Sequence, residues 1–84
     1  MTDQEILREL TTIIQDVLGD EALVIGPDTT ADTVEGWDSF NHINIVAATE
    51  MHFAVKFQTG ELESLHSVGH LVALVGRKLA QKGR

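Results

Sequence analysis

The chain passes from loop to helix within one stretch, Glu35-Gly36-Trp37-Asp38-Ser39-Phe40-Asn41-His42-Ile43. The residues before it are irregular in pattern, and the residues after it are apolar with helical spacing. Asp38 is a favourable N-cap residue, which places Ser39 at the first helical position. A group on the Ser39 oxygen would lie at the positive end of a helix dipole, beside unpaired backbone N–H groups. Such a position suits a phosphate ester.

Apolar residues elsewhere recur with the i, i+3, i+4 spacing of amphipathic helices. The expected helices span residues 3–18, 39–52, 59–65 and 67–80. Because an apolar helical stripe must pack against other elements, we predict an all-α four-helix bundle with a long first loop and a short third helix. We expect a single domain over residues 1–84.

Local signals support these boundaries. Thr2 followed by Glu5 is typical of a capping box, and Gly19 is a plausible helix stop. We expect the following residues on the inward face of the second helix: Phe40, Ile43, Val46, Ala47 and either Glu50 or Met51. The long connection from Asp20 to Trp37 is rich in turn residues, and connections of this length are often functional. We expect these side chains to hold it against the core: Leu23, Val24, Ile25, Val34 and Trp37.

Composition narrows the function classes. The chain has 84 residues, a net charge of −7 and no cysteine. All of its acids lie between Asp3 and Glu63, so nucleic acid is an unsuitable partner and basic protein surfaces are better ones. No apolar run approaches the roughly 20 residues of a membrane span. The N-terminus lacks the basic start of a signal peptide, so we expect a cytoplasmic protein with no membrane partner.

A hydrolase site and a metal site both have little support in the sequence. His42 lies three residues after Ser39, but a hydrolase also needs an orienting acid and an oxyanion hole, and the Gly-x-Ser-x-Gly elbow is absent. His66 and His70 have i, i+4 spacing, whereas zinc sites want three or four ligands. We therefore expect neither a catalytic residue nor a metal site. Taken alone, the Asp-Ser pair is also common as part of a simple helix cap.

The segment from Gly36 to Val46 resembles the phosphopantetheine attachment motif of acyl carrier proteins. The likeness extends over nearly the whole chain, through the amphipathic first helix, the long loop, and the segments 60–65 and 67–69. It implies that Ser39 is esterified by 4′-phosphopantetheine, which a separate phosphopantetheinyl transferase takes from coenzyme A. The thiol of the arm then carries acyl groups as thioesters between loading and accepting enzymes. Asp38 is the motif acid, implied to help the transferase engage.

Two departures from the family pattern are visible. Phe40 replaces the usual leucine after the serine, and we expect it to remain an apolar anchor. The helix after Ser39 has Glu50 as its only acid, where fatty-acid members usually have several. The resemblance implies an acyl carrier for fatty-acid, polyketide or other specialised biosynthesis. From these two departures we expect a specialised monomeric member rather than the main fatty-acid carrier. The partner surface is assigned to Trp37, Asn41, His42, Asn44 and Ile45.

Three alternatives stay open at the level of sequence. The chain could be an aminoacyl or peptidyl carrier. It could be an interaction module that keeps the carrier fold without the arm. The third alternative, a small hydrolase, has the weakest support.

Overall fold

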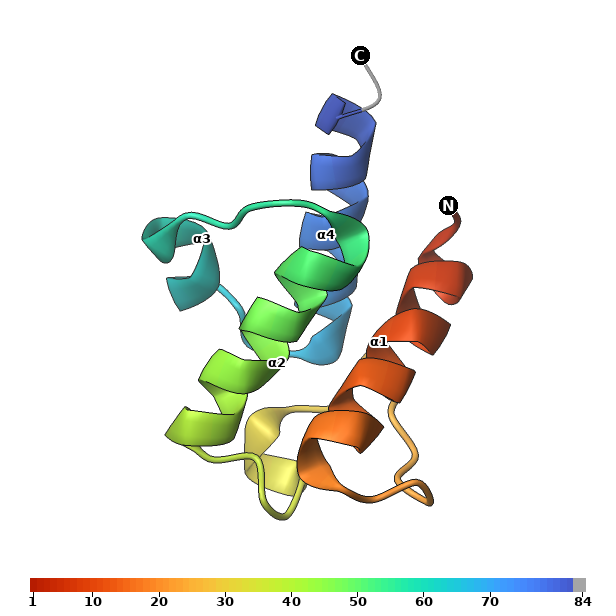
Figure 1. The fold of residues 1–84 in the computed structure, drawn as a ribbon, viewed down its shortest axis with the longest axis vertical. Coiled ribbons are helices and arrows are strands. Elements are labelled where there is room, and N and C mark those ends of the chain that lie inside the picture. Colours follow the sequence, from red (N-terminus) through yellow and green to blue (C-terminus); the bar gives the residue numbers. More distant parts are fainter. Residues whose placement is uncertain (83–84) are drawn as a thin grey trace.

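The computed structural model describes residues 1–82, which form a bundle of helices (Figure 1). In chain order these elements are α1 (Asp3–Leu18), the 3₁₀ helix η1 (Ala31–Thr33), α2 (Ser39–Phe53), α3 (Thr59–Glu63) and α4 (Val68–Lys82). No strand occurs within residues 1–82, so the expected all-α class is confirmed. The single-domain expectation extends to residues 83–84, which lie outside the described residues.

The helix bounds differ in detail from the expected ranges. The first helix begins and ends as expected, and α2 is one residue longer at its C-terminal end. The helix α3 ends at Glu63 rather than at Leu65, and α4 spans 68–82 rather than 67–80. Within residues 1–82, none of the helices combines the length and the apolar character that a transmembrane span needs.

Both ends of α1 are fixed by local interactions. The Thr2 hydroxyl accepts a hydrogen bond from the Glu5 backbone N–H at 3.2 Å, and the Glu5 carboxylate accepts one from the Thr2 N–H at 2.8 Å. The bond from the Thr2 backbone is the main reason that the pKa of Glu5 is lowered. At the other end Gly19 takes a left-handed conformation with φ +69°, which a residue without a β-carbon adopts at no steric cost. The capping box and the glycine stop are thus present.

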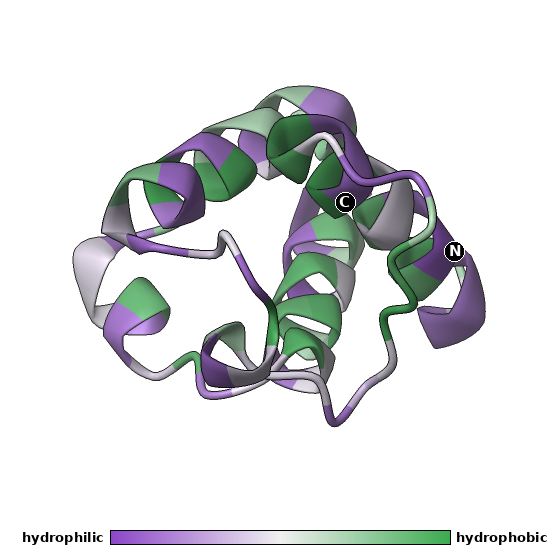
Figure 2. Cartoon of the chain, turned by 90° about the horizontal axis from the view of Figure 1, so that it is seen from below, coloured by the Kyte–Doolittle hydropathy of each residue, from purple (hydrophilic) through white to green (hydrophobic). Residues whose placement is uncertain are grey.

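The core lies where α1 packs against α2 and α4, and α1 runs antiparallel to both (Figure 1). Apolar and polar bands alternate along the helices, as amphipathic packing requires (Figure 2). Side chains from all three long helices and from the first loop are buried here. The largest of those almost wholly buried are Ile6, Leu10, Ile14, Ile45, Val68 and Val75.

The inward face of α2 differs from the expected one. The buried residues are Ile45, Val46, Thr49 and Phe53, whereas Phe40, Ile43 and Met51 are 72%, 66% and 83% exposed. Ala47 is exposed as well, and Glu50 is only half-buried. Thr49 is fully buried because its hydroxyl donates to the Ile45 carbonyl at 2.7 Å, which satisfies its polar group inside the helix. The assignment of Phe40, Ile43, Ala47 and Met51 to the core is therefore wrong.

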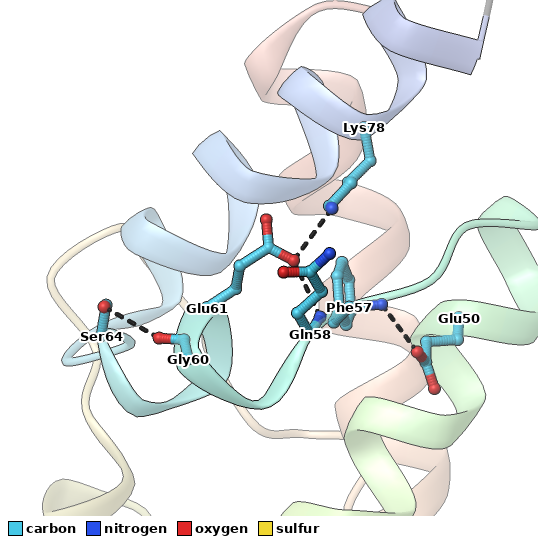
Figure 3. Close-up of polar contacts among 7 residues, drawn as sticks. All are labelled: Glu50, Phe57, Gln58, Gly60, Glu61, Ser64 and Lys78. Atoms are coloured by element: carbon cyan, nitrogen blue, oxygen red, sulfur yellow. Dashed lines mark hydrogen bonds and ion pairs between the residues drawn. The ribbon is translucent and has the colours of Figure 1, made fainter.

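Polar side chains hold α3 against the bundle (Figure 3). The Glu61 carboxylate oxygen Oε1 accepts from the Gln58 backbone N–H at 2.8 Å and from Lys78 Nζ of α4 at 2.9 Å. The backbone bond first, and then the Lys78 ammonium, hold the pKa of Glu61 below its usual value. Glu50 Oε2 of α2 accepts from the Phe57 backbone N–H at 2.9 Å. These contacts fix the C-terminal end of the connector between α2 and α3, at Phe57 and Gln58.

The long first loop is tied to the N-terminus of α4. The carbonyls of Thr29 and Pro27 accept from the backbone N–H groups of Val68 and Gly69, both at 2.8 Å. These bonds satisfy two of the N–H groups that a helix start leaves without an intrahelical partner. Ile25 and Val34 are buried beneath the loop as expected. Val24 is 88% exposed, so its expected packing against the core is wrong.

Candidate functional site

Ser39 is the first residue of α2, directly after the N-cap residue Asp38. The Asp38 oxygen Oδ1 accepts from the Asn41 backbone N–H at 2.8 Å, which is the capping bond that the sequence predicts. Ser39 itself is exposed, and its hydroxyl therefore lies at the positive end of a 15-residue helix within reach of a second protein. This geometry suits an oxygen that is to carry a phosphate ester.

A tight turn before Asp38 sets the direction from which the chain enters α2. Gly36 has φ +88°, a left-handed conformation that favours glycine. Its carbonyl oxygen accepts from the Asp38 backbone N–H at 3.0 Å and from the Asn41 side-chain amide at 2.7 Å. Asn41 thus joins the turn to the first helical turn through both its backbone and its side chain. The sequence motif predicts the cap. The hydrogen bond from the Asn41 side-chain amide to the Gly36 carbonyl has no recognisable signature in the sequence.

Trp37 and His42 form a pair beside Ser39. The indole Nε1–H donates to His42 Nδ1 at 3.1 Å, and the rings stack with centroids 6.2 Å apart at 27°. The lone pair of His42 Nδ1 is therefore taken up by the indole N–H. Within residues 1–82 no hydrogen bond joins His42 to Ser39. The serine–histidine pair that a hydrolase would need is therefore not formed in the described part of the chain.

Phe40 and Ile45, two apolar members of the predicted site, each lie on the opposite side of α2 from the one expected. Phe40 was expected to be a core anchor, but it is mostly exposed next to Ser39. Ile45 was assigned to the partner surface, but none of its side chain is exposed, because it faces the core with Val46 and Phe53. Ile45 is therefore removed from the partner surface. The remaining assigned residues are half-buried: Trp37, Asn41, His42 and Asn44.

A small cavity of about 60 Å³ lies beside the Trp37–His42 pair. It is lined by Thr29, Ala31, Trp37, His42, Leu65, His66, Ser67, Val68 and Leu71. For comparison, an apolar cavity of about 150 Å³ holds a molecule the size of benzene. In this conformation the cavity is therefore too small for an acyl chain, although it opens next to the residues that flank Ser39.

The two histidines at the start of α4 pair with each other. The His66 backbone N–H donates to His70 Nδ1 at 3.1 Å, and the two rings meet edge to face. This bond caps the helix start and uses the Nδ1 lone pair of His70. No group of three or more histidine, aspartate or glutamate side chains in residues 1–82 is placed to hold a metal ion.

An exposed serine at the start of a helix, behind a fixed acidic cap, is accessible to modification by another enzyme. The comparisons with known proteins agree. The model of the phosphopantetheine attachment site family matches residues 8–75. An acyl carrier protein of Rhodococcus erythropolis is 32% identical over 98% of this chain and 89% of its own length. A meromycolate extension acyl carrier protein of Mycolicibacterium smegmatis is 31% identical over 88% and 75%.

A solved structure gives the same answer at the level of the fold. The solution structure of a holo acyl carrier protein from Geobacter metallireducens has a TM-score of 0.86 and 41% identity, covering 90% of this chain and 87% of that one. The chain therefore belongs to the acyl carrier protein family, with 4′-phosphopantetheine as its covalent cofactor. It is a carrier on which transferases and acyl-handling enzymes act, and not itself a catalyst.

Proposed function

We propose that Ser39 is the residue that carries the 4′-phosphopantetheine arm. The observation that supports it is the exposed hydroxyl at the first position of α2, immediately after the Asp38 cap and within the segment that the family model matches. The transferase forms a bond between Ser39 Oγ and the phosphorus of the arm, and the pyrophosphate P–O bond of coenzyme A breaks. Adenosine 3′,5′-bisphosphate leaves, and the hydroxyl proton of Ser39 is lost. The arm supplies a thiol to a chain that has no cysteine of its own.

The residues around Ser39 fit a phosphate ester. The helix start places positive dipole potential near the new phosphate, and no other acid lies in the first turn of α2. Asp38 is occupied by its bond to the Asn41 N–H, so its carboxylate is held in place beside Ser39 rather than swinging freely. Asp38 is thereby a fixed negative group that the transferase can recognise.

Loading of the arm tests this proposal directly. The purified chain is incubated with coenzyme A and a broad-specificity phosphopantetheinyl transferase, and its intact mass is measured. We expect one arm on the wild type and on Ser64→Ala, and none on Ser39→Ala. Ser64 is a suitable control because it is also exposed, with its hydroxyl donating to the Gly60 carbonyl. An arm on Ser39→Ala, or none on the wild type, would contradict the proposal.

We further infer a specialised biosynthetic role for a monomeric carrier, rather than service as the general fatty-acid carrier. The support is electrostatic: Glu50 is the only acid in α2, and its carboxylate is bonded to the Phe57 backbone. A partner that reads a strongly acidic helix finds little charge here. The intact mass of the protein isolated from its own cells tests this role, because the arm retains its cargo. An ordinary saturated fatty acyl group as the main cargo would refute the specialised role, and an aminoacyl group would favour the peptidyl-carrier alternative.

A further inference from the structure

A phosphodiester on Ser39 would add negative charge to a part of the chain that is already acidic. The segment from Asp20 to Asp38 holds six acids, and no lysine or arginine occurs between residues 9 and 55. The dipole of α2 offsets part of the new charge, but the Asp38 carboxylate is held directly before Ser39 and repels it. A hydrogen-bond donor or a cation beside Ser39 would therefore stabilise the attached arm.

His42 is the side chain of α2 that is best placed for this contact. It follows Ser39 by three residues, and residues with this spacing are neighbours on a helix surface, with β-carbons about 5–6 Å apart. Its ring also reaches back toward the start of the helix, because Nδ1 accepts from Nε1 of Trp37 at 3.1 Å, five residues earlier in the chain. The imidazole therefore lies at the end of α2 to which the phosphate would be attached.

The hydrogen bonds at this end of α2 leave one donor of His42 unused. The Asp38 carboxylate accepts from the Asn41 backbone N–H, and the Asn41 side-chain amide donates to the Gly36 carbonyl. In an imidazole that accepts at Nδ1, Nε2 is the nitrogen that can donate. Among residues 1–82, Nε2 of His42 has no hydrogen-bond partner. It therefore remains available for a group on Ser39.

The imidazole of His42 is also held in place by its neighbour. The ring is half-buried and stacks on the indole of Trp37, with centroids 6.2 Å apart at 27°. A side chain that is already ordered loses little conformational entropy when it binds. The pair of Trp37 and His42 thus presents Nε2 in a fixed position.

On this basis, and resting on the proposed role of Ser39, we propose that His42 Nε2 donates a hydrogen bond to the phosphodiester of the arm. Trp37 is a positioning residue for this contact, since it acts through the imidazole. Protonation of the imidazole places a full positive charge beside the phosphate and strengthens the contact. Two other titratable groups face this region: Asp38 at the cap, and His66, which lines the same cavity as His42 from the connection between α3 and α4.

Phosphorus NMR of the arm-bearing protein tests the contact directly. A phosphodiester has no proton to lose near neutral pH, unlike a phosphate monoester, whose second ionisation falls at about pH 6. Movement of its signal between about pH 8 and pH 5 therefore reports a titrating neighbour, and histidine is the side chain that titrates in this range. We expect the wild-type signal to move and the signal of His42→Gln to stay in place, because glutamine keeps a donor but gains no charge.

His66→Gln and His52→Gln are the matched controls for His42→Gln. His66 lines the cavity beside His42, and His52 contacts Glu9 near the other end of α2. The phosphorus signal of both controls should move as in the wild type. Trp37→Phe keeps an aromatic ring without the indole N–H, and the movement of its signal should be smaller. Each variant is loaded to completion, as judged by intact mass, before its spectrum is recorded.

A second readout follows the imidazole itself. Long-range ¹H–¹⁵N spectra resolve the two ring nitrogens of a histidine. The Nε2 signal of His42 should shift when the arm is added to the wild type, and it should stay in place when Ser39→Ala is treated in the same way.

Four results would overturn the inference in whole or in part. A wild-type phosphorus signal that does not move between pH 8 and pH 5 would refute the contact, and this result requires no variant. Movement that persists in His42→Gln would also refute it, and movement lost in His66→Gln would assign the contact to His66. Full movement in Trp37→Phe would refute the positioning role of Trp37. Absence of any arm on the wild type would instead refute the proposed role of Ser39, which keeps the two proposals distinguishable.

Discussion

Replacement of Gly69 by alanine should destabilise the bundle through a single contact. Gly69 is the second residue of α4, and its N–H donates to the Pro27 carbonyl at 2.8 Å. A β-carbon on residue 69 would lie 2.8 Å from that same carbonyl oxygen and 3.5 Å from its carbon. Carbon and carbonyl oxygen in contact are normally about 3.3 Å apart or more. The first loop must therefore move away from α4 by about half an ångström.

The expected cost follows from what this movement stretches. The bond from Gly69 to Pro27 and the neighbouring bond from Val68 to Thr29 both lengthen, and each contributes about 1 kcal/mol. Crowding of a packed contact typically costs about 1–3 kcal/mol. Alanine recovers up to about 1 kcal/mol through its higher helix propensity. The free energy of unfolding should fall by about 1–2 kcal/mol, which lowers Tm by about 4–16 °C in a domain of this size.

Thermal and urea unfolding followed by circular dichroism measure this effect. Gly76→Ala is the matched control, because it lies in the same helix and its β-carbon would meet Ile6 Cδ1 at an ordinary 3.7 Å. The control should gain about 0.5–1 kcal/mol, since alanine replaces glycine in a helix interior. If Gly69→Ala is as stable as the wild type or more stable, the contact between the first loop and α4 is not rigid, and the reasoning fails.

Three further predictions concern Asp38, Phe40 and Glu61. Asp38→Ala should lower the free energy of unfolding by about 1 kcal/mol in urea unfolding. Asp38→Asn should retain most of the wild-type stability, because asparagine also caps helices. Equal losses in the two variants would mean that the cap bond to Asn41 contributes nothing. Phe40→Ala should change the free energy of unfolding by less than about 0.5 kcal/mol in a thermal melt, as for other exposed side chains. A loss of about 3–5 kcal/mol would instead show that Phe40 is buried. The pKa of Glu61, followed by NMR titration of its carboxylate, should lie below 4.5, and Lys78→Gln should raise it in part. Because the folded pKa is lowered, the contribution of Glu61 to stability is present above pH 4.5 and is lost as the pH falls through the folded pKa; Glu61→Gln should remove that pH dependence.

Features set by neighbouring residues were predictable from the sequence. Three local features depend only on residues within about one helical turn. They are the capping box of Thr2 and Glu5, the left-handed Gly19, and the Asp38 cap. Such local choices need no knowledge of the rest of the fold. The same reasoning placed Ser39 at the first position of α2. The N-terminal end of α2, and with it the exposed position of the serine, was therefore recoverable from sequence alone.

Contacts between distant segments were not predictable in the same way. The approach of Pro27 to Gly69 joins residues 42 positions apart, and the pairing of Glu61 with Lys78 depends on how α3 lies against α4. A glycine at the second position of a helix has no distinctive pattern, since its role appears only when the opposite backbone is placed. The same holds for Val24, which differs from its buried neighbour Ile25 only in the side of the loop that it faces.

The error over α2 has a more instructive cause. Apolar residues occur on two opposite sides of this helix. Helical spacing therefore fits either of two sets, the exposed Phe40, Ile43, Ala47 and Met51 or the buried Ile45, Val46 and Phe53. Thr49 lies on the same side as the second set, and a polar residue argues against burial unless its hydroxyl forms a hydrogen bond. Its bond to the Ile45 carbonyl satisfies it and makes that face suitable for the core. A helix with two apolar sides can bury only one of them in a bundle of this size. The side that begins at Phe40, next to the Ser39 hydroxyl, is the one left exposed.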